Sequence, residues 1–166
     1  MRLRADVTID APPAAVWEFV GDPRGQLRFW SGITRYEPAG RRLTGVGARY
    51  RVLMRLGSAD VGGLIELVEW QPRVELAWSS VSGVDMRGRF RLRGRDDDRR
   101  THVELRLAYG IAGAGLTGWL AEQVAAPTVR GHLRGTLAEL ARQVEHEQAR
   151  AEAAARRQRL RARHVS

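Results

Sequence analysis

The sequence predicts an α+β domain in which a curved antiparallel sheet of seven strands wraps around one long C-terminal helix. Three observations lead to this prediction. Residues 33 to 110 alternate between apolar and polar in runs separated by turn residues, as half-buried antiparallel strands do. A similar run at 3–9 precedes a helical pattern at 13–20. From residue 116 to 144, apolar residues recur every three or four positions, which indicates an amphipathic helix.

The individual elements follow from the same patterns. We expect strands at 3–9, 33–38, 46–54, 59–70, 73–82, 84–95 and 101–110, and short helices at 13–20 and 24–30. In the strand at 84–95, Met86, Phe90 and Leu92 alternate with arginines, so we expect those arginines on the outer, wet face of the sheet. Pro127 interrupts the long helical pattern, and its missing amide predicts a kink or a break there.

Composition limits the classes of protein that the chain can belong to. A chain of 166 residues with 43% hydrophobic residues is long enough for one buried core. No apolar run approaches the roughly 20 residues that cross a bilayer, and the first ten residues lack the apolar stretch of a signal peptide. We therefore expect a cytoplasmic protein. The absence of cysteine excludes disulfides and thiolate chemistry.

Much of the net charge of +9 lies in a C-terminal tail. Residues 148–166 hold six arginines and one acid, Glu152. We expect a ligand-binding domain at 1–147, followed by a basic, Ala/Arg-rich tail at 148–166 that is helical or disordered. Every basic residue is arginine, which favours background composition over phosphate recognition, so nucleic-acid binding is not expected. Contact of the tail with an anionic membrane or a protein remains an alternative.

The inner face of the predicted sheet combines large and small residues. Trp78 and Phe90 share it with Gly63, Ser80 and Gly88. Such a mixture fits a cavity lined with aromatic rings or, equally well, an interdigitated core without a cavity. The residue types alone do not decide between these two interpretations.

Several stretches of the chain resemble a known superfamily. They are "VTIDAPPAAVWEFVGDP" near the start, "FWSGITRYEP", "GVGARYRV", and the terminal "GLTGWLAEQVAAPTVRGHLRGTLAELARQVE". Together they resemble the START-like, Bet v 1-type helix-grip superfamily (SRPBCC), and within it the bacterial polyketide cyclase/dehydrase-like group. The resemblance covers residues 1 to about 147 and implies a helix-grip fold.

The resemblance also implies a binding cavity between the sheet and the C-terminal helix. Its ligand would be a hydrophobic small molecule such as a lipid, a sterol or an aromatic polyketide. Carried over by position, the expected ligand-binding residues are Trp30, Tyr50, Val52, Met54, Ile65, Leu67, Leu76, Trp78, Met86, Phe90, Leu116, Trp119 and Gln123.

The sequence carries few marks of catalysis, so we expect a carrier or binding protein. The inner strand positions offer almost no acid that could act as an acid/base catalyst, and the weak catalytic candidates are Arg35, Tyr50 and Tyr109. The first alternative is a polyketide cyclase, aromatase or dehydratase that uses the same cavity. The second is an interaction module that binds nucleic acid, membrane or protein through the basic tail.

No metal or cofactor is expected. The four histidines show no spacing typical of metal ligands, and cysteine is absent. "GAGLTG" at 113–118 matches the glycine pattern of dinucleotide-binding loops, but no strand follows it, and that motif requires a strand-helix-strand unit.

Overall fold

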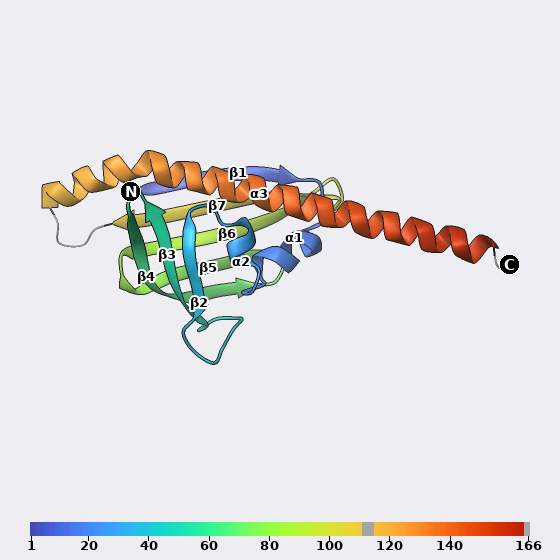
Figure 1. Cartoon of the computed structure of the whole chain (residues 1–166), viewed down its shortest axis with the longest axis horizontal. Coiled ribbons are helices and arrows are strands. Elements are labelled where there is room, and N and C mark those ends of the chain that lie inside the picture. The colour runs from blue at the N-terminus through green and yellow to red at the C-terminus, as the bar shows by residue number, and fades with distance from the viewer. Residues whose placement is uncertain (111–114, 165–166) are drawn as a thin grey trace.

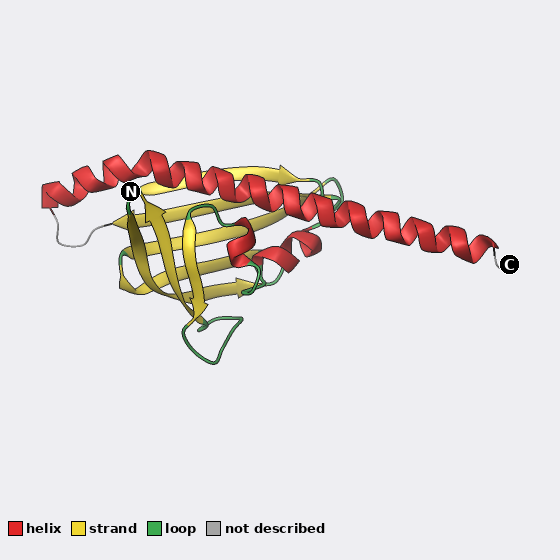
Figure 2. Cartoon of the chain, viewed as in Figure 1, coloured by secondary structure: helices red, strands yellow, loops and turns green. Residues whose placement is uncertain are grey.

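The computed structural model describes the backbone of residues 1–110 and 115–164, and their side chains except those of 115–120, 122, 163 and 164. Within these residues the chain forms one sheet and three helices (Figures 1 and 2). The strands are β1 (Arg2–Ile9), β2 (Ile33–Pro38), β3 (Arg49–Leu56), β4 (Ala59–Gln71), β5 (Glu75–Gly83), β6 (Asp85–Arg95) and β7 (Arg100–Gly110), and the helices are α1 (Pro13–Val20), α2 (Gln26–Phe29) and α3 (Gly115–His164).

The sheet is an antiparallel meander with one added strand. Its order is β1-β7-β6-β5-β4-β3-β2, and each neighbouring pair is antiparallel. Strands β2 to β7 follow one another along the chain, while β1 closes the far edge by pairing with β7. The predicted α+β fold, a seven-stranded sheet with a long C-terminal helix, is confirmed.

Helix α3 packs mainly against one side of this sheet. Figure 1 shows it running along β1 and β7, with α1 and α2 below it. Its buried stripe is the one that the sequence predicts, Val129, Leu133, Leu137, Leu140 and Val144. These side chains meet the buried apolar residues of β1, β7 and α1 in one core, and burial of each Val or Leu contributes about 1.5–3 kcal/mol.

The helix continues well past its packed part. It passes through Pro127 without a break, and Figure 1 shows a bend in its orange first part. It also passes through residue 147 and projects from the sheet as far as His164, so the domain boundary expected there remains a prediction. Among the described residues, no helix has the length and apolar character needed to span a membrane.

Two predicted strands begin later than expected. The strand expected from residue 46 begins at Arg49, because Gly45 and Gly47 both take positive φ angles, 81° and 90°, in a turn. Val46 is therefore 55% exposed rather than inward-facing. Similarly, Val74 is 46% exposed in the turn before Glu75.

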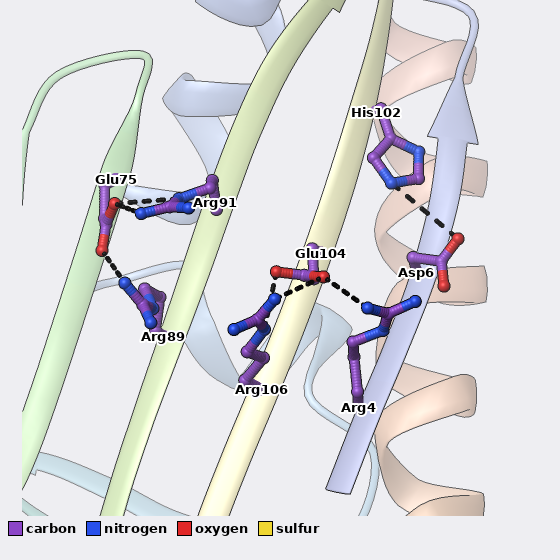
Figure 3. Close-up of polar contacts among 8 residues, drawn as sticks. All are labelled: Arg4, Asp6, Glu75, Arg89, Arg91, His102, Glu104 and Arg106. Atoms are coloured by element: carbon purple, nitrogen blue, oxygen red, sulfur yellow. Dashed lines mark hydrogen bonds and ion pairs between the residues drawn. The ribbon is translucent and has the colours of Figure 1, made fainter.

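The outer face of the sheet carries the arginines of β6, as predicted. Figure 3 shows the ion pairs of Arg89 and Arg91 with Glu75 on β5. The Glu75 carboxylate accepts hydrogen bonds from Arg89 at 2.8 Å and from Arg91 at 2.9 Å. Burial alone would raise the pKa of Glu75, but the bonds from these two arginines outweigh it and hold the pKa below its usual value.

The Glu75 pair network should make the stability of the sheet depend on pH. A lowered pKa in the folded state stabilises the protein above the ordinary carboxyl value of 4.5, and this contribution is lost as the pH falls through the folded-state pKa. We expect Glu75→Gln to lower the free energy of unfolding by about 1 kcal/mol at pH 7 and by less at pH 3. Urea denaturation at the two pH values measures the difference.

Glu37→Gln provides the control, since Glu37 is 61% exposed and lies 3.7 Å from Arg35. It should change the stability by no more than a few tenths of a kcal/mol. An equal loss for Glu75→Gln at both pH values would contradict the assigned ion pairs.

Candidate functional site

A cavity of about 290 Å³ lies between the sheet and α3, on the side that the helix stripe leaves uncovered. It is formed by α2, by β2 to β7, and by the part of α3 that precedes His132. Its described lining consists of Gln26, Trp30, Ile33, Tyr36, Val52, Met54, Leu56, Val61, Gly62, Ile65, Leu67, Leu76, Trp78, Val84, Met86, Phe90, Leu107, Tyr109, Ala121, Ala125 and Val129.

The described lining contains no charged side chain and few polar ones. Gln26 is one of these few, and its amide is already engaged. Its Nε2 donates to the carbonyls of Val20 and Asp22, each at 2.9 Å, and its Oε1 accepts from the indole N–H of Trp30 at 2.9 Å. These bonds fix α2 and the Trp30 ring, and they leave the Gln26 amide with little capacity to hydrogen-bond a ligand.

An aromatic cluster forms one wall of the cavity. Trp30 packs edge-on against Phe90 and Trp78, with ring centroids 5.5 and 5.8 Å apart. The Trp78 ring lies over Gly88 on the neighbouring strand, where a Cβ atom would come within 2.0 Å of the ring. Large and small residues therefore interdigitate at this point, and the cavity occupies the space beyond them.

Two stacked tyrosines occupy the β2–β3 side and have different roles. The rings of Tyr36 and Tyr50 are 4.7 Å apart. The Tyr50 hydroxyl donates to the carbonyl of Leu43, whereas Tyr36 lines the cavity. Burial, followed by the neighbouring Tyr50, raises the pKa of Tyr36, so its hydroxyl keeps its proton and can donate to a ligand.

The loop between α2 and β2 holds α3 over the cavity. The backbone N–H of Ser31 donates to Oγ1 of Thr136 at 3.0 Å, and the Ser31 hydroxyl lies 3.3 Å from Nδ1 of His132. The other ring nitrogen of His132 lies 3.1 Å from the carbonyl oxygen of Arg55 on β3. These contacts anchor the middle of α3, and the small side chains of Ala121 and Ala125 leave room beneath its preceding turns.

The residues expected to bind a ligand divide into three groups. Nine of them line the cavity: Trp30, Val52, Met54, Ile65, Leu67, Leu76, Trp78, Met86 and Phe90. Two of them, Leu116 and Trp119, have side chains outside the described residues. The remaining two, Tyr50 and Gln123, do not line it, because Tyr50 turns toward Leu43 and Gln123 is exposed on α3.

The weak catalytic candidates have different environments. Tyr109 lines the cavity. Arg35 does not line the cavity, since its side chain is 48% exposed and pairs with Glu37. A register shift between Ile33 and Arg35 in β2 explains this, since it brings Ile33 and Tyr36, three positions apart, onto the cavity face.

Sequence reasoning missed several lining residues. Ile33 and Tyr36 were missed because strict alternation does not reveal a bulge. Gln26 follows a turn in the sequence, and only the structure shows that it is buried and hydrogen-bonded to the carbonyls of Val20 and Asp22. Ala121 and Ala125 lie four positions apart on a helix, which was a usable signal for a face with small side chains.

The described side chains form no metal-binding cluster. Among them, no three His, Asp or Glu residues gather in a way that could hold a metal ion. The glycine motif at 113–118 begins in residues 111–114, which lie outside the described residues.

Comparison with protein families gives a match over most of the chain. The model of a family described as "Polyketide cyclase / dehydrase and lipid transport" matches residues 1–145. No curated protein sequence matches the chain.

Solved structures with a similar fold include two proteins described as aromatase/cyclases. TTHA0849 from Thermus thermophilus aligns with a TM-score of 0.73 at 22% identity, covering 87% of this chain and 97% of that one. The Zhui aromatase/cyclase from Streptomyces sp. R1128 aligns with a TM-score of 0.72 at 20% identity, covering 87% and 93%. The di-domain aromatase/cyclase BexL of the BE-7585A biosynthetic pathway aligns with a TM-score of 0.60 at 19% identity, covering 87% and 46%. At these identities the likeness establishes the fold.

The close contact between Gly88 and Trp78 gives a test of the cavity wall. We expect Gly88→Ala to push the Trp78 ring from its position, and therefore to destabilise the protein by about 1–3 kcal/mol. Gly131→Ala is the matched control, because a Cβ there meets open space on α3 and should stabilise the helix by up to about 1 kcal/mol. Thermal unfolding of the two variants measures both effects, and equal stabilities would contradict the packing of Trp78.

Proposed function

The chain belongs to the polyketide cyclase/dehydrase and lipid transport family, and on that premise we propose that it binds one hydrophobic small molecule in the cavity, as a carrier or binding protein. The family match confirms the resemblance predicted from the sequence. The ligand class that we propose is a lipid, a sterol or an aromatic polyketide-like molecule. The cytoplasmic location expected from the sequence is part of this proposal.

The observation that carries the proposal is the chemistry of the cavity wall. Almost every described lining side chain is aliphatic or aromatic, and no carboxylate, imidazole or guanidinium is among them. Apolar ligand surface moved from water into such a site contributes about 25 cal/mol per Å². A ligand carrying an unpaired charge would instead lose its hydration without compensation.

The size of the cavity favours a compact ligand. About 290 Å³ is at the lower end of the range of roughly 300–1,000 Å³ typical of small-molecule sites. It suits a few fused rings or a single acyl chain better than a lipid with two chains. The Trp30, Trp78 and Phe90 rings offer faces and edges on which a planar ligand can stack.

The same wall favours binding over turnover. General acid/base catalysis requires a titratable group within hydrogen-bond reach of the reacting atom, and the hydroxyls of Tyr36 and Tyr109 are the only such groups in the described lining. The pKa of Tyr36 is raised by its burial, which makes its hydroxyl a donor rather than a base.

Titration with the neutral fluorescent probe N-phenyl-1-naphthylamine tests whether the cavity takes up an apolar molecule. We expect saturable binding by the full chain and at least a tenfold loss of affinity in Val52→Phe, because the larger ring fills space that Val52 lines. Val81→Phe is the control, since Val81 is 49% exposed and is not part of the cavity lining. Equal affinities for the two variants would contradict cavity binding.

Solvent extraction of the purified protein, followed by mass spectrometry, addresses the natural ligand. The proposal predicts an apolar molecule that is present in the wild-type extract and depleted in that of Val52→Phe. Absence of both probe binding and an extractable apolar molecule would overturn it.

A polyketide cyclase or aromatase is the second candidate, and the Tyr36 hydroxyl is the observation that favours it. Within the described part of the chain, this cavity-lining hydroxyl has no hydrogen-bond partner, so it is available to donate to a ketone oxygen of a bound substrate. Two proteins of similar fold are described as aromatase/cyclases.

Tyr36→Phe distinguishes the two candidates, because it removes the donor and keeps the ring. A cyclase should convert a linear poly-β-ketone thioester to a cyclised product at least tenfold more slowly in this variant, while its affinity for N-phenyl-1-naphthylamine stays within twofold. No product from the wild-type protein would leave the carrier as the supported function.

A further inference from the structure

A second hollow, of about 640 Å³, lies on the outer face of the sheet, across the strands from the ligand cavity. Five arginines border it: Arg2 and Arg4 of β1, Arg87 and Arg89 of β6, and Arg106 of β7. Its floor is formed by small residues, among them Ala77, Ser79, Gly88 and Ala108. We call this hollow the arginine basin. The mutual arrangement of Arg4, Arg89 and Arg106 can be followed in Figure 3.

The strand register concentrates positive charge in the basin. Arg4 lies directly opposite Arg106, which lies directly opposite Arg89, so three cations occupy one row across adjacent strands. Like charges at directly opposed positions destabilise a sheet. This row of arginines therefore does not stabilise the pairing of the strands, and its positive charge requires compensation by anions.

Two glutamates supply part of that compensation at one border of the basin. Glu104 lies 3.4 Å from Arg4 and 2.8 Å from Arg106, and Glu75 bonds to Arg89 and also to Arg91. Both carboxylates have a lowered pKa, because the arginine contacts outweigh burial. They remain charged at neutral pH and hold the guanidinium groups that they touch.

Arg2 and Arg87 remain without such partners. Neither makes an ion pair within the described part of the chain, and both are exposed. The register places them on either side of Ala108, which separates their Cα atoms by about two strand spacings, roughly 10 Å. Because alanine covers little of the sheet between them, a small anion can lie on the floor and contact both guanidinium groups.

From this geometry we propose that the arginine basin is a second binding site, which takes a phosphate-bearing group of about two negative charges between Arg2 and Arg87. Arginine forks bind phosphate oxygens in pairs. A phosphate monoester carries about −1.5 to −2 charges at pH 7 and thus balances two unpaired arginines, whereas a single carboxylate would balance one. The phosphate group can belong to a soluble molecule or to a lipid headgroup.

Calorimetric titration of the full chain with inorganic pyrophosphate tests the soluble source. We expect binding that weakens as salt rises and that is at least tenfold weaker in the double variant Arg2→Gln/Arg87→Gln. The matched control is Arg156→Gln/Arg157→Gln, which removes the same charge from the exposed tail of α3. The control should bind within twofold of the wild-type protein.

Sedimentation with phosphatidylcholine vesicles, with and without phosphatidic acid, tests the lipid source. Binding to the acidic vesicles that is lost in Arg2→Gln/Arg87→Gln and kept in the tail control assigns the site to a lipid headgroup; pyrophosphate binding without vesicle binding assigns it to a soluble ligand. Either result supports the basin. The proposal is overturned if neither probe binds, or if the tail control loses as much binding as the basin variant.

The outcome is independent of the ligand cavity. Arg2 and Arg87 do not line the cavity, so both double variants should bind N-phenyl-1-naphthylamine as the wild-type protein does. Failure of the basin proposal is therefore distinguishable from failure of the proposed carrier function.

Discussion

The packing of a single helix stripe against β1 and β7 is the constraint on which the rest of the molecule depends. A sheet with an apolar inner face must bury it, and α3 is the one long helix among the described residues. Its stripe from Val129 to Val144 is buried against the β1 and β7 side. The inner face of the remaining strands is consequently left for α2, for side chains such as Trp30, and for the cavity. One narrow helix over a wide sheet thus leaves a cavity without any element dedicated to forming it.

The cavity stays open because hydrogen bonds hold α2 and α3, the two helices that cover it, in place. Gln26 fixes α2 and Trp30 through three hydrogen bonds, and the contacts of Ser31 and His132 fix α3 to the loop between α2 and β2 and to the carbonyl of Arg55. Hydrogen bonds of this kind are directional, so they fix the position of α3 relative to the loop and to β3. The cavity wall is then free to consist of side chains that recognise shape and apolar surface.

How much of this structure the sequence predicts depends on whether a feature arises from a local pattern in the chain or from the pairing of separate strands. Strand alternation and the helix stripe are local patterns, and they placed the seven strands, the outer arginines and the core stripe from Val129 to Val144. The bulge in β2 is not encoded in alternation, and it places Tyr36 on the cavity wall while Arg35, a weak catalytic candidate, stays outside it. The pairing of Glu75 with Arg89 and Arg91 depends on the register between β5 and β6, and the arginine basin depends on the register of three strands. Neither the Glu75 ion pairs nor the arginine basin can be predicted from the sequence of one strand alone.

The charge on the outer face also determines which face α3 can cover. Along β6, Met86 and Phe90 alternate with Arg87 and Arg89. A shift of the strand register by one residue would therefore place guanidinium groups on the cavity wall. Burying an unpaired charge in an apolar site costs far more than the few tenths to one kcal/mol that a surface ion pair contributes. The arginines therefore disfavour a shifted register, because it would bury their charges. The apolar side chains favour the observed register, because it buries them. Gly88 belongs to this arrangement as well, since the strand can approach Trp78 there only without a side chain. The ligand cavity and the arginine basin are thus consequences of one strand register, one on each face of the same strands.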